Sequence, residues 1–157
     1  MSKVTPKVTP FLMFADRLEE AIALYTKTFP DSDASNVVRR GPDGPVISAE
    51  LRVGGQRFLA YAGGSHFAFS EGFSMFVTCE DQREVDLYWD RLVAGGAKPS
   101  RCGWITDPFG LSWQIIPRRF IELMADRDPA KVQAVVSAML TMEKLDVAGL
   151  ERAWAEA

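Results

Sequence analysis

The sequence predicts an α+β protein in which two β-α-β-β-β modules are followed by a C-terminal helical extension. The order of one strand, one amphipathic helix and three strands occurs twice, and glycine pairs and loop clusters separate the strands. After Pro117 the pattern becomes wholly helical. With 157 residues the chain has the length of one domain, or of two half-domains that share a core. We expect one domain at residues 1–117, made of modules at about 7–62 and 73–117, and the extension at residues 118–157.

The first module begins with a predicted strand at residues 8–14, which is rich in β-branched and aromatic residues. Asp16 is predicted to cap the helix that follows, with Glu19 three residues after it as in a capping box. Apolar residues then recur at three- and four-residue spacing and indicate one face packed on a sheet: Leu18, Ala21, Ile22, Tyr25 and Phe29. Three strands separated by glycine-containing turns complete the module: residues 36–40, 46–53 and 57–61.

The second module repeats this order after a glycine-flanked loop at residues 63–72. A strand at 73–79 precedes a helix capped by Asp81, and Gly95-Gly96 ends that helix. Three short strands follow the helix: residues 98–101, 104–106 and 111–116.

Gln114 is the polar residue that stands out in the last of these strands. Alternation places it on one face with Ser112 and Ile116. A buried carboxamide needs hydrogen-bond partners, so Gln114 either belongs to a structural network or points into a cavity. The preceding Asp107 begins a turn with Pro108, and its side chain is expected to bond to its own backbone.

The extension is predicted to contain three helices. The first spans residues 118–125, the second is capped by Asp128, and the third begins at Asp146. The second of these carries an apolar stripe: Val132, Val135, Val136, Met139 and Met142. Because such a stripe has to be covered, we expect it to pack on its own sheet or on a second subunit, and we expect a homodimer.

Composition and charge exclude several classes of partner. The net charge is −3 and no basic stripe is present, which argues against nucleic acid. No apolar run reaches the length of a membrane span, and the N-terminus has no apolar signal core. The two cysteines, Cys79 and Cys102, form no CxxC pair. We therefore expect a cytoplasmic protein without a membrane or nucleic-acid partner.

Several segments are distinctive enough to compare with a known family: residues 14–25, 54–56, 74–79, Cys102-Gly103-Trp104, residues 112–117 and residues 138–146. In them the chain resembles the PhnB-like family, often labelled 3-demethylubiquinone-9 3-methyltransferase. This family lies in the vicinal oxygen chelate, or glyoxalase-like, superfamily. The resemblance implies the paired-module fold of the glyoxalase/bleomycin-resistance/dihydroxybiphenyl dioxygenase type.

The resemblance also indicates where metal-dependent members of the superfamily hold their ion. Those positions correspond to Thr9, Ser74, Gln114 and a position near Leu59 or Tyr61. Hydroxyl and amide groups are weak substitutes for carboxylate or imidazole, so we expect no metal and no other cofactor. Without a metal, the cavity would be a mostly apolar ligand pocket with few polar groups, or its residues would simply fill a core. The residues expected to line it are Thr9, Phe11, Ser74, Phe76, Trp104, Ser112 and Gln114.

Two other residues have reactive side chains but no evident partner in the sequence. His66 is the only histidine and lies in a loop, where a solvated or packed role is favoured over catalysis. Cys102 would need a neighbouring base to act as a nucleophile, and none is adjacent.

These observations favour a protein that binds a small organic molecule in a metal-free cavity. One alternative is an enzyme on the same scaffold, either a methyltransferase, as the family label implies, or an isomerase- or lyase-like enzyme. Another is a resistance protein that sequesters its ligand. The sequence has no glycine-rich strand-to-helix turn of the kind that binds methyl donors, so whether the chain is an enzyme stays open.

Overall fold

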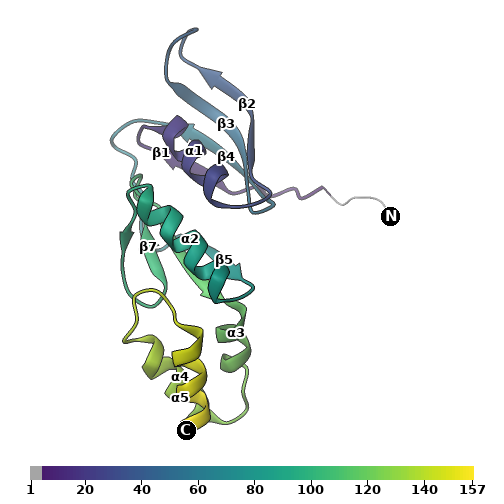
Figure 1. Cartoon of the computed structure of the whole chain (residues 1–157). Helices are drawn as coiled ribbons and strands as arrows, with labels where there is room; N and C mark the ends of the chain where they lie inside the picture. The colour runs from purple at the N-terminus through teal and green to yellow at the C-terminus, as the bar shows by residue number, and fades with distance from the viewer. Residues whose placement is uncertain (1–4) are drawn as a thin grey trace. The chain divides into compact units, whose positions relative to one another are not determined.

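The computed structural model describes residues 5–157 and divides into two compact units, Met1–Phe69 and Ser70–Ala157. Each unit contains one four-stranded sheet and one helix that belongs to the module, as Figure 1 shows by colour along the chain. The α+β class and the repeated order of elements are therefore as predicted from the sequence.

The first unit consists of a mixed sheet with strand order β1-β4-β3-β2 and one helix. Its elements are β1 (Phe11–Phe14), α1 (Leu18–Thr28), β2 (Asp33–Arg39), β3 (Val46–Val53) and β4 (Gln56–Ala62). β1 runs parallel to β4, and the other neighbours are antiparallel. Alternate residues of β1, Leu12 and Phe14, are buried, and α1 buries Leu18, Ala21 and Tyr25. The predicted amphipathic helix thus covers one face of this sheet.

Several boundaries in this unit differ from the prediction: β2 spans Asp33–Arg39 instead of residues 36–40, and β4 spans Gln56–Ala62 instead of residues 57–61. β1 begins at Phe11 instead of residue 8, and Val8 is 86% exposed, because its β-branched side chain has no sheet neighbour to pack against. Asp16 does not cap α1. The N-cap is Arg17, which has a left-handed backbone (φ 56°) and makes no side-chain cap. The capping-box prediction was wrong here because the helix begins one residue later than the Asp-x-x-Glu spacing implies.

The second unit has the same sheet connectivity, with strand order β5-β8-β7-β6. Its module contains β5 (Ser74–Cys79), α2 (Gln82–Ala94), β6 (Lys98–Pro99), β7 (Trp104–Thr106) and β8 (Ser112–Pro117). Asp81 caps α2 as predicted, since its side chain accepts a hydrogen bond from the Glu84 amide at 2.9 Å. α2 buries one apolar stripe against the sheet: Val85, Tyr88, Trp89 and Leu92.

Asp107 fixes the turn between β7 and β8. Its Oδ1 accepts hydrogen bonds from the amides of Phe109 at 2.9 Å and Leu111 at 3.0 Å. Its Oδ2 accepts a hydrogen bond from the buried indole of Trp113 at 2.9 Å. The predicted turn role is present, and the bond to Trp113 adds a link from the turn to the core.

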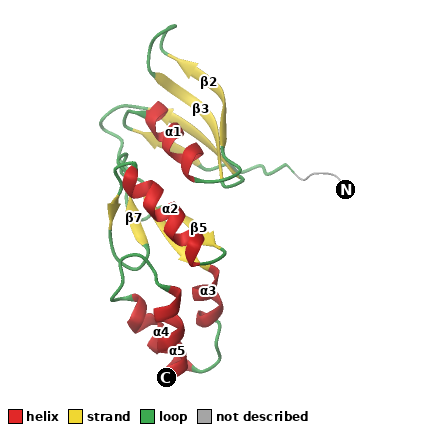
Figure 2. Cartoon of the chain, viewed as in Figure 1, coloured by secondary structure: helices red, strands yellow, loops and turns green. Residues whose placement is uncertain are grey.

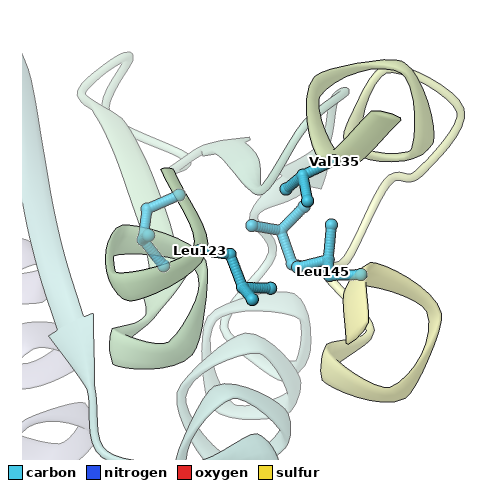
Figure 3. Close-up of a cluster of buried hydrophobic side chains, with 5 residues drawn as sticks. Leu123, Val135 and Leu145 are labelled. Carbon is cyan, nitrogen blue, oxygen red and sulfur yellow. The ribbon is translucent and has the colours of Figure 1, made fainter. Parts of the chain in front are cut away.

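The extension belongs to the second unit and contains α3 (Arg118–Met124), α4 (Pro129–Met139) and α5 (Val147–Glu156), which lie together in Figure 2. A buried cluster joins these helices to the end of β8: Ile116, Leu123, Val135, Leu145 and Leu150 (Figure 3). Val135 of the predicted apolar stripe is fully buried in this cluster. Met139 and Met142 pack against the cluster, so this part of the stripe lies within its own unit, whereas Val132 and Val136 are only partly buried.

The segment before α5 is also held by backbone hydrogen bonds to the turn that precedes β7. The amide of Cys102 donates to the carbonyl of Met142 at 2.8 Å, and the amide of Gly103 donates to Glu143 at 2.7 Å. Both donors have positive φ, 59° for Cys102 and 82° for Gly103. A Cβ at Gly103 would lie 3.2 Å from Leu145 Cγ, so glycine permits this close approach.

Candidate functional site

The face of the second sheet that α2 leaves open carries five of the seven predicted cavity residues. In the β5–β8 pair, Ser74 lies opposite Ser112 and Phe76 lies opposite Gln114. Trp104 of β7 lies opposite Gln114 on its other side. Side chains at paired positions share a face, so the pleat directs all five to one side of the sheet.

Gln114 and Ser74 form the polar centre of this face. The Gln114 Nε2 donates a hydrogen bond to the Ser74 Oγ at 2.9 Å, and the pair is partly buried. Within residues 5–157, no donor to the Gln114 amide oxygen is found. The amide is therefore oriented by Ser74 and retains an acceptor for a bound molecule.

Two aromatic side chains flank this polar pair. Phe76 is 53% exposed although it belongs to a strand, and Trp104 is half-buried. An exposed ring beside a fixed amide is the combination that small-molecule sites use, with apolar surface for contact area and a polar group for orientation.

A cavity of about 300 Å³ lies along the β7 side of this face. Trp104, Thr106 and Ser112 contribute to it, together with residues of the loops before β5 and β7: Glu71, Ser100, Arg101 and Cys102. The volume is at the lower end of the range for small-molecule sites. Thr106 was not predicted, although alternation from Trp104 places it on the same face opposite Ser112.

Thr9 and Phe11 belong to the first unit, so the seven predicted residues fall into groups of two and five. Thr9 precedes β1, and its Oγ1 accepts a hydrogen bond from Arg57 at 3.3 Å. Phe11 is 55% exposed. The hydrogen-bond partner of Thr9 is thus a charged side chain, and Arg57 also forms an ion pair with Glu50 at 3.1 Å.

The reactive side chains of the chain do not form a catalytic pair. His66 is exposed and its ring lies 4.2 Å from that of Phe67. Cys102 lines the 300 Å³ cavity, and its amide is used by the extension. Burial, together with the nearby Glu84 and Asp81 carboxylates, raises the pKa of the Cys79 thiol to about 12, so this thiol is protonated at neutral pH.

The positions that hold a metal in metal-dependent members of the superfamily do not suit one here. Thr9 and Ser74 offer hydroxyls and Gln114 an amide, and both Ser74 and Gln114 are engaged with each other. In the described part of the chain, no group of three or more His, Cys, Asp and Glu residues is arranged to hold a metal ion. The open face therefore presents a neutral amide and hydroxyl beside aromatic rings at these positions.

Comparisons with solved structures identify the fold. The PhnB protein from Bacillus cereus is 30% identical, with a TM-score of 0.64, and the match covers 71% of this chain and 99% of that protein. The protein PA1353 from Pseudomonas aeruginosa is 19% identical, with a TM-score of 0.56, over 72% of this chain and 98% of that one. FosX from Listeria monocytogenes, a fosfomycin resistance protein in complex with Mn(II) and sulfate, is 13% identical, with a TM-score of 0.51, over 71% and 88%. No curated protein matches the chain.

Two four-stranded modules of this topology define a member of the vicinal oxygen chelate, or glyoxalase-like, superfamily. The model of one family, described as 3-demethylubiquinone-9 3-methyltransferase, matches residues 6–116, which is more than half of the sequence. The chain belongs to this PhnB-like family, and the resemblance recognised in the sequence is confirmed.

Proposed function

We propose that the open face of the second sheet binds a small organic molecule that has an apolar body and one hydrogen-bonding group. The observation that carries this proposal is the Gln114–Ser74 hydrogen bond, because it fixes an amide beside the exposed ring of Phe76 and leaves the amide oxygen available. The cavity next to Trp104 supplies room for part of such a molecule.

Binding without a metal is part of the proposal, and the donor set supports it. Thr9, Ser74 and Gln114 present no ionised oxygen and no imidazole. Purified protein is expected to contain no stoichiometric divalent ion, and chelator treatment should leave its melting temperature unchanged. Elemental analysis tests the first expectation, and one tightly bound zinc, nickel or manganese ion per chain would contradict it.

The family label makes methyl transfer the second candidate. Doubly wound methyltransferases bind the methyl donor at a glycine-rich turn on a parallel sheet, whereas both sheets here are mixed and the strand order differs. A methyltransferase on this scaffold would need a donor site of another kind. Turnover of a bound molecule, measured by mass spectrometry, separates this activity from binding alone or from ligand sequestration.

The proposal places the protein in the cytoplasm as a homodimer. Free thiols at Cys79 and Cys102 are in keeping with a reducing compartment.

In the described chain, none of the helices has the length and apolar character needed to cross a bilayer. Val132 and Val136 of the predicted stripe remain partly exposed on α4 and would contribute to the dimer contact. Light scattering at micromolar concentration tests the dimer, and a monomer would contradict it.

The binding site is tested with benzamide and phenol, which combine one ring with one polar group. Affinities are measured by NMR titration for the wild type and for Gln114→Ala. Loss of the amide should weaken benzamide binding by about 1–3 kcal/mol, since a polar group of the probe then lacks its partner. Gln133→Ala is the matched control, because Gln133 is an exposed glutamine on α4 that bonds only to Ser137 among its neighbours. Equal affinities of the two variants would contradict the proposal.

A further inference from the structure

The first unit contains a larger cavity that none of the seven predicted residues lines. Its volume is about 820 Å³, within the range of sites for small organic molecules. The N-terminal half of α1, the turn before β3 and the segment after β4 form its walls. The cavity lies wholly within one unit, so its geometry does not depend on the second.

Most charged side chains around this cavity neutralise one another in pairs. Arg17 pairs with Glu20 at 2.7 Å, and Glu19 pairs with Arg39. Two lining residues remain, Asp16 and Arg40. In the described residues 5–157, neither of them forms an ion pair or a side-chain hydrogen bond, and they do not pair with each other.

The left-handed conformation of Arg17 explains why the Asp16 carboxylate does not cap α1, although it interacts electrostatically with Arg17. In the second unit the corresponding Asp81 accepts a hydrogen bond from the Glu84 amide and so caps α2. In the first unit Arg17 takes the N-cap position, and no side chain caps α1. Asp16 therefore contributes a carboxylate to the cavity wall instead of to the helix.

Apart from these charged side chains and Tyr61, the wall is apolar. Leu18 is buried at the base of α1, and Ile47, Pro45 and Ala62 come from the sheet and its turn. A ligand that fits this cavity thus meets Asp16 and Arg40, the ion-paired side chains of Arg17, Glu19 and Glu20, and an apolar surface.

We propose that this cavity binds a small zwitterion of the α-amino-acid class. The carboxylate of the ligand would bind the Arg40 guanidinium, whose planar donors match a carboxylate. Its ammonium group would bind Asp16, and an apolar side chain would lie against Leu18 and Ile47. This site is separate from the open face of the second sheet and does not rest on the function proposed there.

L-Leucine is the probe that tests the proposal on the full chain. Two molecules that each lack one charged group of leucine serve as matched probes: 4-methylpentanoate, which lacks the ammonium group, and 3-methylbutylamine, which lacks the carboxylate. In ¹⁵N-resolved NMR titrations, leucine should shift the amides of residues 15–23, 46–47 and 61–64. It should bind at least about tenfold more tightly than either matched probe, because each probe loses one charge-assisted contact.

Variants assign the two charges. Arg40→Gln and Asp16→Asn should each weaken leucine binding at least about tenfold, and neither should alter the spectrum of the free protein, since both side chains are exposed. Arg52→Gln is the control, because Arg52 belongs to the same sheet but pairs with Asp31 and Asp33 outside this cavity. The absence of shifts at millimolar leucine, equal binding of 4-methylpentanoate, or equal loss in Arg52→Gln would each overturn the proposal.

Discussion

The two modules share one topology but differ in the length of their two outer strands, and in the second module the C-terminal extension contacts the turn between those strands. In both, the first strand runs parallel to the last, and the remaining strands are antiparallel. β2 and β3 of the first module have seven and eight residues, whereas their counterparts β6 and β7 have two and three. The turn before β7 is instead held by the extension, through the Cys102 and Gly103 amides. The second module therefore depends on the extension for contacts that longer strands supply in the first.

The open faces of the two sheets also differ in chemistry. On the first sheet, Arg57 pairs with Glu50 and bonds to Thr9, so its polar groups are charged and mutually satisfied. On the second, a neutral amide and a hydroxyl lie between the exposed ring of Phe76 and the half-buried ring of Trp104. This difference indicates that the second sheet is the better surface for a neutral organic ligand.

Removing one buried side chain of the extension is expected to have the largest effect. Leu145 is fully buried between the extension and β8, so Leu145→Ala should lower the free energy of unfolding by about 2–5 kcal/mol. Tryptophan fluorescence in urea measures this effect in the second unit, because all four tryptophans lie there. Leu140→Ala is the control and should stay within about 0.5 kcal/mol. Equal effects would show that the extension does not support the module.

Gly103 provides a second test of the same support. An alanine there would have to adopt φ 82°, with its Cβ 3.0 Å from the Ile115 carbonyl oxygen. Backbone strain and crowding together should lower the free energy of unfolding by about 2–4 kcal/mol. Gly110→Ala has a similar φ of 91° but open space around the Cβ, so it should lose only about 1–2 kcal/mol. A loss at Gly103 no greater than at Gly110 would contradict close packing of the extension.

The two helix starts predict unequal effects of the same substitution. Asp81→Ala removes a side-chain cap and should destabilise the second unit by about 1 kcal/mol. Asp16→Ala removes no cap and should stay within about 0.5 kcal/mol. Urea unfolding followed by far-ultraviolet circular dichroism reports both units. A loss of about 1 kcal/mol at Asp16 would show that this aspartate caps α1 in solution.

The smallest expected effect is a pH dependence confined to the second unit. Cys79 ends β5, whereas the fully buried residue that ends β1 is Phe14. Burial raises the pKa of the Cys79 thiol from 9.0 to about 12. The protonated form is thus favoured in the folded state, and its contribution is complete below pH 9 and is lost as the pH rises towards 12. Cys79→Ser should flatten the decline in stability above pH 9, and Cys102→Ser should not. An unchanged decline in Cys79→Ser would contradict the shift.

Sequence patterns predicted the fold well because helix and strand periods depend on local residues. The Asp81 cap, the amphipathic faces of α1 and α2 and the turn at Asp107 follow such local rules. The failure at Asp16 came from the left-handed backbone of Arg17, which no propensity favours for arginine. The predicted first strand was also too long at residues 8–10, which lie outside the β1–β4 pairing although the Pro10 carbonyl accepts a hydrogen bond from the Leu59 amide.

The candidate site was predictable in part, for the same reason. Alternation placed Ser112 and Gln114 on one face, and the register then added Ser74, Phe76 and Trp104. The hydrogen bond between Gln114 and Ser74 joins residues 40 positions apart, so only tertiary pairing reveals it. The 820 Å³ cavity forms where the turn before β3 lies next to the N-terminal end of α1. This is a tertiary contact, so no local sequence pattern predicts it.

The most direct test of the account is a map of the amide shifts that benzamide produces in ¹⁵N-labelled wild-type protein. If the open face of the second sheet is the binding surface, the largest shifts should fall on Ser74, Phe76 and Gln114 and on the Trp104 indole. These residues share one face through the pairing of β5, β7 and β8. Shifts confined to residues 5–69, or spread evenly over the protein, would contradict this claim.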